Sequence, residues 1–220
     1  MKIITTLFIL FFSIQTKTSE VSQIIESLSI KDKNIKIILS KPKRCDDCGM
    51  YEDIKIIFPN GSTKKYTDLT GDKIFLTALD EGGSQLGQYL HLYKMNNETY
   101  FLLLMSQSRP DNKVRIIQIE STDAKVIFQE NSFTFHQMID FDKDGLLDLL
   151  KKGGRGEPVS TTHSSYDPYL VYKSYKKGKW YTFKLDEKLS QKWSKENKFL
   201  WHGPKYNGNI RVDKSGTTLK

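Results

Sequence analysis

Four aspartates and a glycine occupy a nine-residue run near the middle of the 220-residue chain. They are Asp140, Asp142, Asp144, Gly145 and Asp148, in the pattern D-x-D-x-D-G-x-x-D. Calcium takes about six to eight oxygen ligands, alternate residues of a tight loop can turn several carboxylates toward one ion, and glycine permits the sharp turn. Without a cation the carboxylates would repel one another, so the run predicts a Ca²⁺ site. A metal-free, aspartate-rich surface turn is the alternative.

The run is not a complete EF-hand. An EF-hand ends on a glutamate at position 12 of its loop and lies between two helices. Here Lys151 stands at that position, and neither flanking segment, 133–139 or 149–154, shows a helical pattern. The sequence therefore predicts a strand–loop–strand calcium site.

The same run resembles the calcium loops of FG-GAP and VCBS repeats, whose pattern is D-x-D-x-D-G-x-x-D followed by an apolar residue. The resemblance is confined to the loop, and the motif occurs once, whereas propeller proteins of that family repeat it. It implies side-chain ligation by all four aspartates and a backbone-carbonyl ligand from Leu146. Such repeats are associated with adhesion, ligand recognition and extracellular scaffolding, so the resemblance implies a binding role.

The N-terminus has the pattern of an export signal. Met1 and Lys2 precede the apolar run 3–14, and polar residues 15–20 follow it. A short apolar run after a positive charge is typical of a secretory signal peptide and is too short for a comfortable membrane span. We expect residues 1–18 to be the signal peptide of a secreted or periplasmic protein, with an uncleaved anchor as the alternative. No later stretch is apolar and long enough to span a bilayer.

The chain has two cysteines, Cys45 and Cys48. In an oxidising compartment this C-x-x-C pair is expected to form a small disulfide loop. A redox pair and half of a zinc site are the alternatives, but the flanking sequence lacks a βαβ setting and the chain lacks a second cysteine pair.

Residues 19–220 are enough for one domain with a substantial core. Short runs rich in β-branched and aromatic residues alternate with turn signals. The clearest runs are 35–39, 54–58, 63–66, 89–95, 100–105, 114–119, 125–128, 168–172 and 179–183. This pattern predicts an all-β or β-dominated fold of antiparallel hairpins, either propeller-like or a sandwich or barrel. Apolar spacing also predicts two short helices, over 21–28 and 185–193, and the tail after Trp201 is turn-rich.

The segment 153–167 follows the aspartate run and has almost no apolar side chains. Long connections without secondary structure are often functional or disordered, so we expect a protruding recognition loop held by the metal site. Its candidate contact residues are Arg155, Glu157, His163 and Tyr166. Glu157 and His163 could instead act as acid and base, but no complete catalytic signature such as G-x-S-x-G accompanies them.

The precursor carries a formal net charge of +8, and its C-terminal quarter combines many lysines with all three tryptophans. Such a surface can bind anionic polymers, although lysines facing solvent around a core of aromatics are an ordinary alternative. Export disfavours nucleic acid as the partner. The sequence thus predicts a non-catalytic recognition or inhibitor-like protein that binds an unknown protein or an anionic polysaccharide of the envelope or extracellular space. The alternative is a secreted or periplasmic hydrolase acting on an envelope or extracellular polymer.

Overall fold

The computed structural model describes residues 23–41, 53–66, 83–86, 90–106 and 113–211. The predicted signal peptide and the predicted Cys45–Cys48 disulfide lie outside these ranges. The predicted fold class is confirmed, because the described elements are mostly antiparallel strands with a single α-helix.

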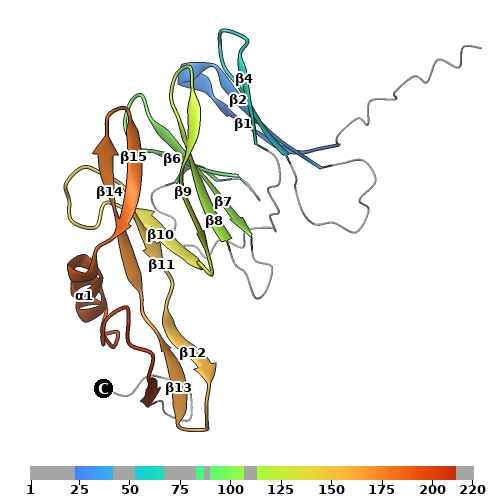
Figure 1. Ribbon diagram of the computed structural model, residues 1–220. Coiled ribbons are helices and arrows are strands. Elements are labelled where there is room, and N and C mark those ends of the chain that lie inside the picture. Colours follow the sequence, from blue (N-terminus) through green and yellow to red (C-terminus); the bar gives the residue numbers. More distant parts are fainter. Residues whose placement is uncertain (1–22, 42–52, 67–82, 87–89, 107–112, 212–220) are drawn as a thin grey trace, which may run out of the picture.

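The described residues form four antiparallel sheets, three larger ones that succeed one another along the chain and a small one near the C-terminus (Figure 1). The first contains β1 (Gln23–Ile30), β2 (Ile35–Lys41), β3 (Asp53–Ile57) and β4 (Thr63–Tyr66), in that order. The second contains β5 (Gly83–Leu86), β6 (His91–Lys94), β7 (Tyr100–Ser106), β8 (Lys113–Ile119) and β9 (Ala124–Asn131). The third has the order β10 (Phe135–Ile139), β11 (Asp148–Lys151), β14 (Leu170–Lys177) and β15 (Trp180–Leu185). The connections are mainly hairpins, which matches the many turn signals in the sequence.

The five-stranded second sheet is covered on both faces, and β7 shows this most clearly. Tyr100, Leu102 and Leu104 belong to a core shared with the first sheet, whereas Phe101 and Leu103 belong to a core shared with the third sheet. Because side chains alternate along a strand, burial on both faces requires an almost uninterrupted apolar run, and residues 100–105 provide one.

Edge-to-face aromatic contacts join the second and third sheets. The ring centroid of Phe101 lies 5.6 Å from that of Tyr181 and 5.7 Å from that of Phe183, both on β15. Phe128 on β9 contacts Phe183 in the same way at 5.6 Å. These pairs fix β15 against the second sheet, because edge-to-face rings stabilise beyond the apolar area that they bury.

The helix predicted over 21–28 is wrong, and the residues that the structure describes there form β1. Pairing with β2 in the register Leu28↔Ile37 and Ile30↔Ile35 buries Ile30 in the first core and packs Leu28 against it. Tertiary pairing therefore overrides a short helical pattern that no cap supports. The helix predicted over 185–193 is confirmed as α1 (Glu187–Glu196), whose N-cap Asp186 accepts a hydrogen bond from the Leu189 N–H at 2.9 Å.

The irregular loop predicted over 153–167 is also wrong. The segment forms the hairpin β12 (Gly154–Pro158) and β13 (His163–Asp167), and β13 pairs in turn with β16 (Asn209–Arg211) in the C-terminal segment. Backbone hydrogen bonds organise this small sheet with little apolar burial. A prediction based on hydrophobic periodicity therefore had no signal to detect.

His91 is a fully buried side chain on β6, and neither ring nitrogen has a hydrogen-bond partner among the residues that the structure describes. Burial lowers the pKa of His91 to about 4. In the unfolded chain the pKa of this histidine is near 6.5. As the pH falls below 6.5, His91 therefore becomes protonated in the unfolded chain while it stays neutral in the folded one. Stability from this group is complete above pH 6.5 and is lost progressively toward pH 4.

We expect the free energy of unfolding to fall by about 2 kcal/mol between pH 6.5 and pH 5 because of His91. Urea denaturation of the wild-type protein and of His91→Leu across this range measures the contribution as a difference. The difference also removes the opposing effect of Asp148, whose raised pKa favours the folded state in acid. Parallel pH profiles for the two proteins would contradict the prediction.

Candidate metal site

The aspartate run lies in the connection between β10 and β11 (the yellow loop of Figure 1), as a strand–loop–strand site requires. The pairing Ile139↔Asp148 closes the two strands at the base of the loop. Inside the loop, Lys143 and Gly145 have φ angles of 64° and 86°. This left-handed backbone favours glycine, and Gly145 stands where the turn is sharpest.

Aspartate side chains stabilise the turn of the loop by accepting hydrogen bonds from its backbone N–H groups. Asp140 accepts hydrogen bonds from the N–H groups of Asp144 at 3.0 Å and Gly145 at 2.8 Å, one on each carboxylate oxygen. The Asp144 Oδ1 accepts from the Leu146 N–H at 2.9 Å. Such contacts are typical of aspartate in turns, and here they hold the carboxylates on the inner side of the loop.

Asp148 is the buried member of the run, with no exposed surface. Its Oδ1 accepts from the Ser174 N–H of β14 at 2.9 Å, and its Oδ2 accepts from the Phe141 N–H at 3.3 Å. Burial raises the pKa of Asp148 to about 6, the charges of Asp142 and Asp144 add to that rise, and the two N–H donors oppose it. Asp148 therefore joins the loop to the middle of the third sheet.

Three carboxylates converge at this point. Oxygens of Asp140, Asp142 and Asp148 all lie within 4.8 Å of one another. Oxygens on opposite sides of one calcium ion are about 5 Å apart, because each calcium–oxygen distance is about 2.3–2.6 Å. The Oδ1 of Asp142 is buried and has no hydrogen-bond partner in the described part of the chain. The spacing and the unpaired oxygen both suit a hard cation.

Lys173 of β14 also belongs to this site, although no local sequence pattern predicts it. Its ammonium group pairs with the Oδ2 of Asp142 and, at 2.9 Å, with the Oδ2 of Asp144. These contacts raise the pKa of Lys173 above its ordinary value. Burial alone would raise the pKa of Asp144, but Lys173 and the Leu146 N–H lower it overall. Lys173 is adjacent to Ser174, the donor to Asp148, so one strand delivers both contacts.

Two predicted ligands differ from the other three in position. Asp144 is not part of the converging group, and its oxygens are engaged by Leu146 and Lys173. The Leu146 N–H bonds to Asp144, and ligation by its carbonyl stays a prediction. Leu146 also packs against the core between the second and third sheets, which anchors this end of the loop.

The candidate recognition residues lie on the hairpin β12–β13, outside the carboxylate group. The exposed His163 contacts the Thr162 hydroxyl through Nδ1 at 2.9 Å. The Tyr166 hydroxyl donates to the Leu200 carbonyl at 3.2 Å and accepts from the His202 N–H at 3.0 Å, so this tyrosine fastens the C-terminal segment. The side chains of Arg155 and Glu157 fall outside the part that the structure describes.

Comparison with known proteins assigns no family. No family model and no solved structure matches the chain. A stretch of 80 residues is 31% identical to a protein of Acanthamoeba polyphaga mimivirus named as an ATP-dependent RNA helicase, covering 36% of this chain and 4% of the viral protein. The chain thus corresponds to a small fraction of that protein's length. Among the described residues no helix has the length and apolar character needed to cross a membrane.

Proposed function

We propose that this protein is an exported, calcium-binding recognition protein that binds a partner and catalyses no reaction. The observation that carries the proposal is the convergence of Asp140, Asp142 and Asp148 within 4.8 Å in a strand–loop–strand connection. An all-oxygen donor set suits calcium. Zinc prefers histidine and cysteine, and magnesium demands a near-ideal octahedron.

Lys173 would compete with such an ion for the carboxylate oxygens. Its single positive charge partly offsets the carboxylates while the site holds no metal, and it occupies oxygens of Asp142 and Asp144. A calcium ion carries twice that charge and must displace the ammonium group to bind the Oδ2 atoms of Asp142 and Asp144. Lys173 is therefore a built-in competitor that weakens calcium binding and keeps the empty loop folded.

The metal's role in this proposal is architectural. The loop joins β10 to β11, and β11 is followed directly by the hairpin β12–β13. At the tip of that hairpin Val159 is 57% exposed, and the residues after it, up to His163, are exposed as well. A cation that ties the loop to β11 and β14 would stiffen the support of this tip, and rigidity lowers the entropic cost of binding a partner.

The proposal is tested by capturing partners on the immobilised mature protein from secreted or envelope fractions of the source organism. We expect at least one partner that is retained in millimolar calcium, released by chelator, and absent with Asp142→Ala. Glu187→Ala, which removes an exposed carboxylate on α1, is the matched control and should retain the partner. Identical capture with calcium, with chelator and with Asp142→Ala would contradict a calcium-organised recognition surface. The hydrolase alternative stays a prediction that no contact described above favours.

A further inference from the structure

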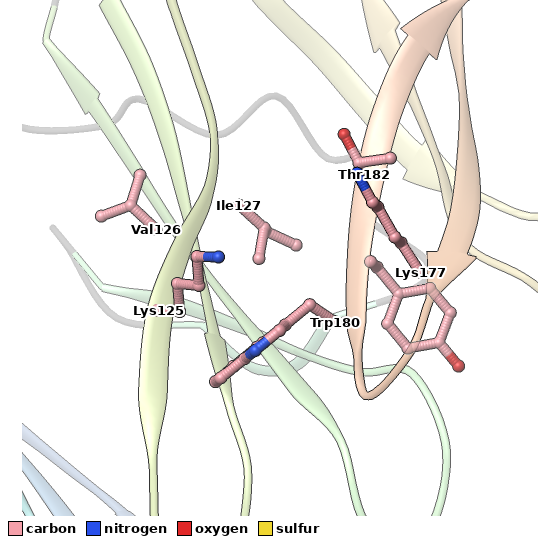
Figure 2. A pocket seen from close by; sticks show the side chains of 7 residues that line it. Lys125, Val126, Ile127, Lys177, Trp180 and Thr182 are labelled. Carbon is pink, nitrogen blue, oxygen red and sulfur yellow. The ribbon is translucent and has the colours of Figure 1, made fainter.

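A cleft of about 320 Å³ opens between β9 and β15, on a part of the molecule that the calcium loop does not use. Figure 2 shows Lys125 and Ile127 on one side and Lys177, Trp180 and Thr182 on the other, with the indole of Trp180 lying across the space between the two strands and Val126 pointing away from it. The volume is at the lower end of the range of small-molecule sites, which is about 300–1,000 Å³.

The buried side-chain amide of Gln118 fixes the backbone position of Trp180. Gln118 on β8 has no exposed surface. Its Nε2 donates to the Lys179 carbonyl at 2.8 Å, and its Oε1 accepts from the Tyr181 N–H at 2.7 Å. One side chain therefore holds the backbone on both sides of Trp180 against the second sheet. This kind of second layer keeps a binding side chain in place before a ligand arrives.

Strand register brings the lysines to the same place. Lys125 pairs across the sheet with Gln118, and Lys177 pairs with Trp180. The ammonium groups of Lys179 and Lys125 lie over the Trp180 ring, at 4.6 Å and 5.7 Å from its centroid. Such cation–π contacts restrain side chains that would otherwise move freely.

The cleft carries an excess of positive charge. Lys179 forms an ion pair with Asp123 at 3.2 Å. Lys125 and Lys177 form no ion pair with any residue that the structure describes. Two uncompensated ammonium groups therefore border a space that also has an apolar side chain, Ile127, and a hydroxyl group on Thr182. This combination suits a ring that has an apolar face, hydroxyl groups and a negative charge.

We propose that this cleft binds a carboxylated sugar unit of an acidic polysaccharide. Nucleic acid fits less well, because single-stranded chains stack successive bases on aromatic faces and the only indole here already carries two ammonium groups. Lysine also offers point charges, which lack the planar fork with which arginine grips a phosphate. The inference takes its ligand class from the proposed recognition role and does not depend on the calcium loop.

The test measures binding of a fluorescent hyaluronan hexasaccharide by anisotropy at physiological salt, in the presence of chelator so that calcium plays no part. The double variant Lys125→Gln/Lys177→Gln should bind at least tenfold more weakly than the wild type. The control Lys184→Gln/Lys188→Gln removes the same charge from exposed positions on β15 and α1 and should change affinity less than twofold. A neutral chitin hexasaccharide should not compete.

Three results would overturn the proposal: no hyaluronan binding by the wild type, an equal loss in the control variant, or a preference for hexathymidylate that depends on Lys125 and Lys177. The last result would make nucleic acid the ligand of the cleft. Because calcium is absent throughout, failure here leaves the metal site untouched. A protein that binds hyaluronan but does not respond to calcium would instead refute the metal site alone.

Discussion

Replacing Asp148 by alanine should lower the free energy of unfolding by about 3 kcal/mol in chelator, and by more than that in calcium, which would stabilise only the wild type. The carboxylate is fully buried and accepts hydrogen bonds from the N–H groups of Ser174 and Phe141. Alanine would leave the buried Ser174 N–H without a partner and would open a cavity next to β14. The loss of one converging ligand should also abolish any response to calcium.

Urea denaturation in chelator and in calcium measures both effects of the Asp148 substitution. Asp148→Asn is the matched control: its amide oxygen can still accept from Ser174, so we expect a cost of about 1 kcal/mol. A variant Asp148→Ala that unfolds at the same urea concentration as the wild type would show that the loop is not tied to the third sheet in this way.

Replacing Gly153 by alanine should destabilise the fold by about 3 kcal/mol, because the added methyl group meets rigid backbone. A Cβ atom at Gly153 would lie 2.1 Å from the Pro168 carbonyl carbon, 2.2 Å from its oxygen and 2.4 Å from the Tyr169 nitrogen. Gly153 follows β11 and precedes β12, so the close approach to Pro168 is where the chain passes from the third sheet to the hairpin β12–β13.

Gly178→Ala provides the comparison for Gly153. Gly178 is at the β14–β15 turn with a φ of 63°, and nothing lies within 4 Å of an added Cβ atom. Only the cost of a left-handed backbone applies there, about 1 kcal/mol. Thermal or urea unfolding of both variants checks the contrast. Equal destabilisation would mean that the chain at Pro168 can move aside.

Sequence patterns predicted the strands and missed what depends on distant pairing. The continuous apolar run of β7 and the capped, amphipathic α1 each have a local signal strong enough to identify them. β1 carries a helical spacing that only its pairing with β2 overrides. The hairpin β12–β13 has almost no apolar side chains, so its strands follow from backbone pairing with each other and with β16.

In the candidate metal site, too, the local loop could be predicted from the sequence and the contact from a distant strand could not. The aspartate spacing and Gly145 indicated a tight loop with convergent carboxylates, and the structure brings Asp140, Asp142 and Asp148 together. Lys173 could not be predicted, because nothing local to β14 shows which loop its side chain will face. The basic cleft depends in the same way on packing between β9 and β15, strands that are not neighbours in any sheet.

Calcium-dependent stability tests the central claim most directly. A thermal melt of the mature protein in millimolar calcium should be compared with the same melt in chelator. At free calcium about 100-fold above the dissociation constant, binding adds ~2.7 kcal/mol, which for a domain of this size raises the Tm by roughly 5 to 10 °C. Asp142→Ala, which removes a converging carboxylate, should show no rise, and Lys173→Gln should show a larger rise because the competing ammonium group is gone. An unchanged wild-type Tm would contradict the calcium site, and a rise confined to Lys173→Gln would make Lys173 the permanent counter-ion of the loop.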